Sequence, residues 1–140
     1  MSRENVELVK GLFAAGALTD KKALLSALPE LISQMCDPEI EWHEDPQRAD
    51  ARVYRGHGGV RESFGRWLDQ WDEYGGEAER FVDCGDDVLV VAREHGRGAK
   101  SGVSVSSRIF IVLTFRDGKL LRYREFYDES VALEAVGFSE

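Results

Sequence analysis

Asp117-Gly118 lies between two hydrophobic runs, and this arrangement is the strongest β-hairpin signal in the sequence. The flanking runs, residues 103–115 and 120–127, have the composition of strands. Two earlier strands are predicted over residues 78–84 and 88–95, joined by a short Gly-Asp-Asp turn. Four consecutive strands joined by short connections favour an antiparallel meander in the second half of the chain.

The first half of the sequence is mainly helical. Helical segments are predicted before residue 36, with a break at Pro29 because proline lacks the amide hydrogen that a helix interior needs. Residues 40–44 alternate like a strand, and the polar residues 45–52 predict a loop. The longest helix is predicted to open at residues 56–59 and to stop at Tyr74. Its apolar residues recur every three or four positions and form one stripe: Val60, Phe64, Trp67, Leu68 and Trp71.

Helices followed by a contiguous meander predict an α+β fold. We expect a cone-shaped, curved, mixed or antiparallel sheet wrapped around the N-terminal helices and one long helix, with an internal pocket. A length of 140 residues with no visible linker predicts a single domain over residues 1–140.

Composition narrows the classes of partner. The net charge of −8 argues against nucleic acid and against anionic membranes, since both bind cationic surfaces. No apolar run is long enough for a membrane span and no signal peptide is evident, so a cytoplasmic protein is expected. Cys36 and Cys84 are far apart and predict free thiols. No spacing typical of a metal site or a cofactor motif is present in the sequence.

Strand alternation predicts which side chains face the pocket. If Trp42, Arg93 and Tyr123 point inward, period-two alternation brings further residues to the same face. Two carboxylates, an arginine and a histidine among aromatic rings suit proton transfer on a small organic molecule. The expected inward set is Trp42, Glu44, Arg93, His95, Tyr123, Glu125 and Tyr127, with Trp67 contributed by the long helix.

The order of several short motifs resembles a known family. An Asp-Pro turn before Glu41-Trp42 is followed by the segment Tyr54–Val60, and later by the Arg116–Lys119 turn, Tyr127-Asp128 and the segment Ala132–Gly137. Together these features resemble the SnoaL-like branch of the nuclear-transport-factor-2-like superfamily. The resemblance implies the cone fold, a homodimer, and relatives that include ketosteroid isomerases, polyketide cyclases and limonene-epoxide hydrolases.

The resemblance also implies roles for individual residues. Glu125 matches the last-strand acid that serves as general acid or base in the cyclases, and Arg93 matches the middle-strand arginine of the epoxide hydrolases. His95 stands where those hydrolases have an aspartate. Trp42 and Glu44 replace their tyrosine and asparagine, so three of the five positions differ from the hydrolase pattern.

The sequence leaves alternatives open for these residues. Arg93 and Glu125 are either a catalytic pair or a buried ion pair, and His95 lies either in the pocket or at its rim. Trp42 and Trp67 are either core residues or ligand contacts. If the protein is an enzyme, we expect Glu125 to transfer the proton as general base or acid and His95 to act as the complementary proton-transfer group. Arg93 would orient Glu125.

The sequence therefore supports a cofactor-independent isomerase, cyclase or hydrolase acting on a small, largely apolar molecule. The alternative is a non-catalytic dimeric module that binds a hydrophobic ligand or has a structural role. Phe110 and Val112 are predicted to point outward, and we expect this outer face to form the homodimer.

Overall fold

The four strands of the predicted meander form most of one sheet. A computed structural model describes residues 2–14, 16, 18 and 20–137, called here the described residues. They contain α1 (Ser2–Ala14), α2 (Lys21–Met35), β1 (Cys36–His43), β2 (Val53–Arg55), α3 (Gly56–Leu68), β3 (Trp71–Cys84), β4 (Asp87–Gly98), β5 (Ser104–Arg116), β6 (Lys119–Phe126) and α4 (Glu129–Ala135). The fold is α+β, as predicted.

The sheet has the strand order β2-β1-β6-β5-β4-β3. Strands β3 to β6 are antiparallel neighbours, which confirms the meander, whereas β1 runs parallel to β6 and makes the sheet mixed. The β5–β6 turn places Asp117 at φ 51° and Gly118 at φ 77°. Two successive positive φ angles are those of a type I′ hairpin turn, for which Asp-Gly is a preferred pair.

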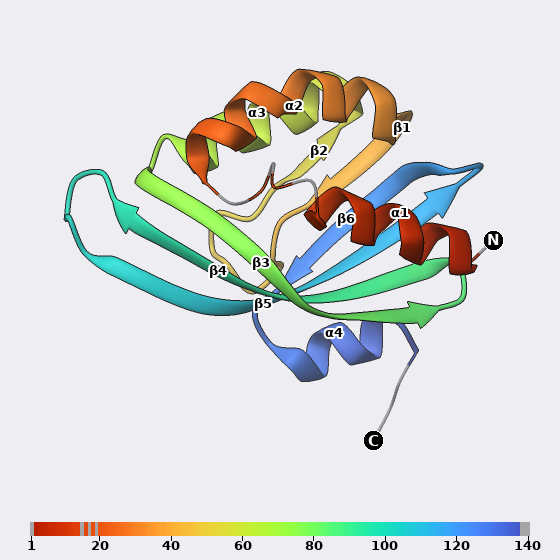
Figure 1. Cartoon of the computed structure of the whole chain (residues 1–140). Coiled ribbons are helices and arrows are strands. Elements are labelled where there is room, and N and C mark those ends of the chain that lie inside the picture. Colours follow the sequence, from red (N-terminus) through yellow and green to blue (C-terminus); the bar gives the residue numbers. More distant parts are fainter. Residues whose placement is uncertain (1, 15, 17, 19, 138–140) are drawn as a thin grey trace.

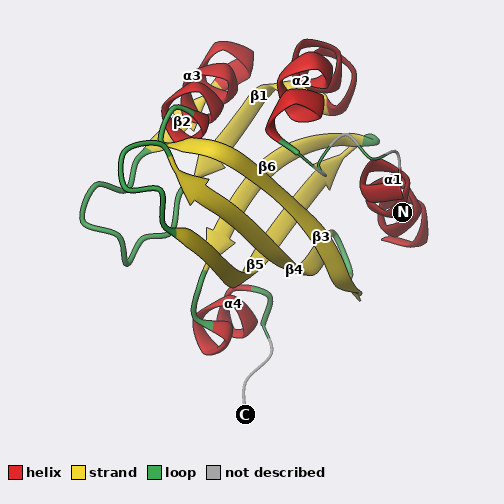
Figure 2. Ribbon diagram, turned by 60° about the vertical axis from the view of Figure 1, so that its left-hand side comes forward, coloured by secondary structure: helices red, strands yellow, loops and turns green. Residues whose placement is uncertain are grey.

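The sheet is strongly curved, and helices cover its two faces unequally (Figures 1 and 2). Helices α1, α2 and α3 lie on one side, which we call the concave face, and α4 lies on the other, the convex face. Among the described residues, no helix is both long enough and apolar enough to cross a bilayer.

Two predicted boundaries need correction. Helix α2 continues through Pro29, which lies on the exposed side of the helix. Proline has no amide hydrogen to donate to the carbonyl of Leu25, one turn earlier, but Leu25 is also exposed, so water can bind this carbonyl. Helix α3 ends at Leu68, and Trp71 already belongs to β3. A Cβ atom at Gly96 would lie only 2.8 Å from Cε3 of the Trp71 ring. Glycine at this position of β4 therefore leaves room for the ring and allows the two strands to pair. The short strand β2 was not predicted.

Both faces of the sheet carry packed hydrocarbon. Val88, Val90 and Ala92 belong to the core cluster on the concave face. The convex cluster contains Phe110 and Val112, together with residues of α4. The interpretation that these two outward residues need a partner chain is therefore wrong, because the chain's own C-terminal helix covers them. Homodimerisation stays a prediction from the family resemblance.

Candidate functional site

Two adjoining cavities lie beneath the concave face. The larger, about 190 Å³, is the apolar cavity, which is lined mainly by hydrocarbon side chains of α1, α2, α3 and the central strands. The smaller, about 50 Å³, is the polar chamber. Its lining residues are Trp42, Glu44, Arg48, Ser63, Phe64, Trp67, Tyr74, Glu94, Ile109, Tyr123, Glu125 and Tyr127. Trp42, Phe64, Tyr74, Glu94, Ile109 and Tyr123 line both cavities, so the two spaces share a boundary.

Strand β6 places Glu125 in the polar chamber. Its side chain is only 12% exposed, and Oε1 accepts a hydrogen bond of 3.1 Å from the Tyr123 hydroxyl. Burial raises the pKa of Glu125 to about 7; the Tyr123 hydrogen bond and the Arg48 charge lower it, whereas the nearby charges of Glu94 and Glu44 raise it. Near neutral pH, the Glu125 carboxyl therefore exists in both protonation states.

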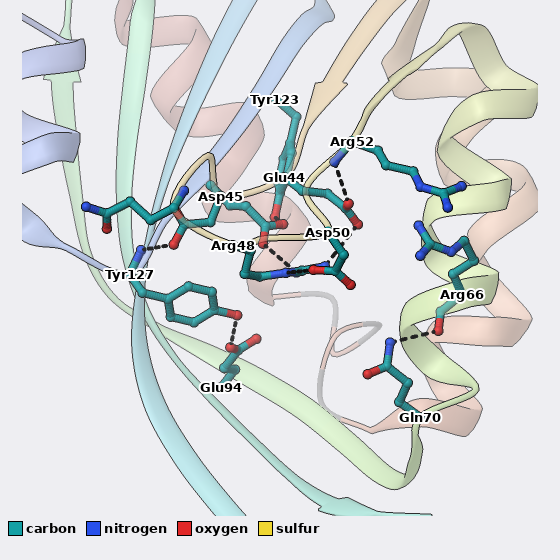
Figure 3. A network of polar contacts seen from close by, with 12 residues as sticks. Glu44, Asp45, Arg48, Asp50, Arg52, Arg66, Gln70, Glu94, Tyr123 and Tyr127 are labelled. Atoms are coloured by element: carbon teal, nitrogen blue, oxygen red, sulfur yellow. Dashed lines mark hydrogen bonds and ion pairs between the residues drawn. The ribbon is translucent and has the colours of Figure 1, made fainter.

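A second carboxylate, that of Glu94 on β4, lines the same chamber as Glu125. Its Oε2 accepts a hydrogen bond from the Tyr74 hydroxyl and its Oε1 accepts one from the Tyr127 hydroxyl. Burial, followed by the charge of Glu94, raises the pKa of both tyrosines. Both phenols therefore stay protonated near neutrality and hold the carboxylate in place. Figure 3 shows the ring of Tyr127 directed at Glu94.

Arg48 is the one cation among the chamber-lining residues of the described chain. It lies on the loop after β1, with Nε 3.2 Å from Asp50, Nη2 3.6 Å from Glu44 and Nη1 3.8 Å from Glu125. Its guanidinium carbon lies 5.4 Å from the centre of the Trp67 ring, within the range of a cation–π contact. Figure 3 shows Arg48 beside Glu44 and Asp50.

The loop that carries Arg48 is held by two buried acids. Glu44, with a side chain only 5% exposed, accepts a hydrogen bond of 3.0 Å from the Arg52 amide, and its own amide donates to the Arg52 carbonyl. Asp45 accepts from the amide of Gln47 at 2.9 Å and from that of Tyr127 at 3.2 Å. Glu44 therefore closes the loop, and Asp45 ties the loop to the end of β6.

The predicted inward set is brought together in large part. Trp42, Glu44, Trp67, Tyr123, Glu125 and Tyr127 all line the polar chamber. The rings of Trp42 and Tyr123 are stacked, with centroids 3.6 Å apart and planes 6° from parallel. Trp42 belongs to the buried core and Trp67 packs against it, and both rings also line the polar chamber, while ligand contact by either ring stays a prediction.

Arg93 and His95 are placed differently from the prediction. Arg93 borders the apolar cavity, but its guanidinium is directed to the convex side, where Nε lies 3.7 Å from Glu79 and Nη1 donates to Ser106 at 3.4 Å. His95 is exposed and pairs with Ser106 in the β4–β5 register. The predicted pairing of Arg93 with Glu125 is therefore wrong, since the two side chains lie on opposite faces of the sheet.

Three of the chamber residues absent from the predicted inward set form its polar contacts. Glu94 lies on the same face of β4 as Val88, Val90 and Ala92, which point inward. Residues 88–92 are all apolar, so the sequence does not show which of the two faces points inward. Tyr74 was assigned to the end of a helix, and Arg48 to a polar loop. No local signal connects Arg48 to the site, since only the folded loop brings it to Glu125.

Neither thiol is placed for reactivity. Burial raises the pKa of Cys36, at the edge of the apolar cavity, to about 11. Both cysteines are free. No group of three or more His, Cys, Asp or Glu side chains among the described residues is arranged to hold a metal ion.

The sequence profile of the SnoaL-like domain matches residues 20–123, most of the chain. The chain belongs to the SnoaL-like family. This membership agrees with the resemblance drawn from the motifs. Among curated protein sequences, none matches this SnoaL-like chain at a significant level.

Solved structures show the same fold. A proposed SnoaL-like polyketide cyclase from Jannaschia sp. CCS1 is 19% identical, with a TM-score of 0.72 over 99% of this chain and 95% of that one. TerC, co-crystallised with polyporic acid, is 20% identical, with a TM-score of 0.71 over 95% and 98%. A hypothetical protein with a ketosteroid isomerase-like fold from Catenulispora acidiphila, in complex with trimethylamine, is 14% identical, with a TM-score of 0.67 over 91% and 92%. At these identities the similarity establishes the fold.

Proposed function

We propose that this SnoaL-like protein is a cofactor-independent acid–base enzyme that moves a proton on a small, largely apolar organic molecule, in an isomerisation, cyclisation or hydration. The observation that carries the proposal is the position of Glu125. Its carboxyl is buried in the polar chamber, beside a cavity lined by hydrocarbon, with Tyr123 hydrogen-bonded to it.

Glu125 suits proton transfer because both of its forms are accessible. A general acid or base works best when its pKa lies near the operating pH, and the pKa of about 7 meets this condition. Tyr123 orients the carboxyl by its hydrogen bond, and Arg48, 3.8 Å away, favours the ionised form. Arg48 thus takes the orienting role that the sequence assigned to Arg93.

The adjoining apolar cavity supports a small hydrophobic substrate. Its walls include Leu28, Ile32, Val60 and Leu113, which offer apolar contact and few polar partners. The similar structures that hold polyporic acid and trimethylamine are consistent with the binding of small organic molecules by this fold.

The decisive experiment is hydrogen–deuterium exchange at the carbon next to the carbonyl in a panel of small ketones, followed by NMR in D2O. The wild-type protein is expected to catalyse exchange of at least one ketone, with a rate that rises as Glu125 ionises around pH 7. Glu125→Gln should reduce the rate by roughly 10²-fold or more, since glutamine cannot accept the proton.

Glu79→Gln is the matched control, because Glu79 is a carboxylate of the convex face that forms ion pairs with Arg93 and Arg108. Its exchange rate should equal that of the wild type. Exchange that survives in Glu125→Gln would contradict the assignment of the proton transfer to Glu125.

A non-catalytic binding module is the second candidate, and the apolar lining of the larger cavity favours it. In that case the protein would bind a hydrophobic fluorophore, Glu125→Gln would bind it equally well, and no ketone of the panel would exchange above the buffer rate.

A further inference from the structure

The charges around the polar chamber are unbalanced. Three carboxylates line it, those of Glu44, Glu94 and Glu125, against the single guanidinium of Arg48. Arg48 is already engaged, because Glu44, Asp50 and Glu125 all lie within 3.8 Å of its nitrogens. An anionic group entering the chamber would therefore face three carboxylates and one arginine whose charge is already balanced.

Hydrogen-bond direction gives a second, independent reason. The hydroxyl hydrogens of Tyr74 and Tyr127 are donated to Glu94, and that of Tyr123 is donated to Glu125. Each hydroxyl therefore has no hydrogen left to donate to a ligand. The chamber consequently offers phenol and carboxylate oxygens, which suit a ligand head group that brings its own donors.

The aromatic walls favour a positive charge as well. Six of the chamber-lining residues are aromatic, and ring faces attract cations. Arg48 illustrates this attraction, since its guanidinium lies over the ring of Trp67 with carboxylates on the other sides. The chain's own cation thus occupies part of the chamber in the manner expected of a bound one.

From this geometry we infer that the two cavities take an amphiphilic amine, with its ammonium group in the polar chamber and its hydrocarbon part in the apolar cavity. The inference rests on the proposed function and adds one feature to its small, largely apolar substrate, an ammonium group at one end, so that an amino ketone is the expected best member of the ketone panel. The net charge of −8 would also increase the encounter rate of such a cation.

The test compares three six-carbon probes that differ only in the head group. Binding of hexylammonium, hexanol and hexanoate to the full-length protein is measured by isothermal titration calorimetry at pH 8 and low salt. Hexylammonium is expected to bind about 10-fold more tightly than hexanol, the effect of a single favourable charge contact, and hexanoate should bind most weakly. Equal affinity of the three probes, tighter binding of hexanoate, or no binding of hexylammonium would overturn the inference.

Two variants locate the binding. Glu94→Gln keeps the shape of the side chain but removes its charge, and should reduce the preference for hexylammonium over hexanol. Arg48→Gln removes the competing cation and should tighten hexylammonium binding several-fold. Loss of hexylammonium binding in Arg48→Gln, with a melting temperature close to that of the wild type, would contradict the inference, because Arg48 would then support the binding of this cation rather than compete with it.

Glu79→Gln again serves as the control and should leave all three affinities unchanged. The exchange assay with Glu125→Gln tests catalysis, whereas the probe series tests the charge of the ligand on the wild-type protein. Failure of the proposed function and failure of the inferred substrate class therefore give different results.

Discussion

The concave and convex faces of the sheet carry similar side chains but use them differently. On the concave face, Glu94 and Glu125 are largely removed from solvent and accept hydrogen bonds from tyrosines. On the convex face, Glu79 forms ion pairs with Arg93 and Arg108, all partly exposed to water. Burial, rather than residue type, thus separates a carboxyl suited to proton transfer from an ordinary surface ion pair.

The two faces also differ in how their hydrocarbon is packed. Beneath α4, the convex cluster of Leu89, Val91, Phe110 and Val112 lines neither the apolar cavity nor the polar chamber. On the concave face, three helices cover the sheet and still leave the apolar cavity open. The convex cluster therefore joins α4 to the sheet, whereas the apolar cavity on the concave face has room for a ligand.

Truncation of neighbouring core residues should give the largest effects. Phe110→Ala beneath α4 is expected to lower the free energy of unfolding by about 3–5 kcal/mol, because it creates a new cavity. Ile111→Ala, on the opposite face, should cost less, about 2 kcal/mol, since its side chain already borders an open cavity. Urea unfolding of both variants measures the difference. The reverse order would show that the concave face is as tightly packed as the convex one.

Neutralising the buried acid should stabilise the protein at high pH. The folded-state pKa of Glu125, about 7, lies above the ordinary value of 4.5, so its contribution to stability is greatest below pH 4.5 and is lost as the pH rises to 7. Glu125→Gln removes this loss. The free energy of unfolding of the Glu125→Gln variant should exceed that of the wild type by up to about 3 kcal/mol at pH 8.

Urea unfolding at pH 4.5 and pH 8 checks this sign. The difference between Glu125→Gln and the wild type should grow with pH across this window, whereas Glu79→Gln should show no such growth. A variant that is less stable than the wild type at pH 8 would indicate that ionised Glu125 is a structural ion-pair partner of Arg48.

The exposed ion pairs of the convex face should give the smallest effect. Arg93→Gln is expected to change the free energy of unfolding by less than about 1 kcal/mol, because the side chain is 41% exposed and water screens its pair with Glu79. Proton exchange should continue at the wild-type rate, in Arg93→Gln and in His95→Gln alike. A tenfold loss of exchange in either variant would show that the convex face takes part in the chemistry.

Local signals in the sequence were sufficient for most elements. The Asp117-Gly118 turn, the start of α3 at Gly56 and the alternation of β6 were all predicted correctly. Tyr123, Glu125 and Tyr127 could be placed on one face because successive side chains of a strand point to opposite faces of the sheet. The error at Trp71 arose because its spacing continues the apolar stripe of α3, although its backbone pairs with β4.

The sequence by itself determined the order of the elements, the meander and the face of β6 that carries Glu125, since each depends on turn chemistry or on period-two alternation. Only the tertiary structure decided which side chains of β4 point to the concave face. Its residues Val88 to Ala92 are all buried, because helices cover both faces of the sheet, so hydrophobicity alone does not distinguish the two registers. The same covering decides that Glu94 enters the chamber while Arg93 and His95 point away from it. The position of Arg48 likewise depends on long-range contacts, because buried hydrogen bonds to β6 and across its own loop hold it there.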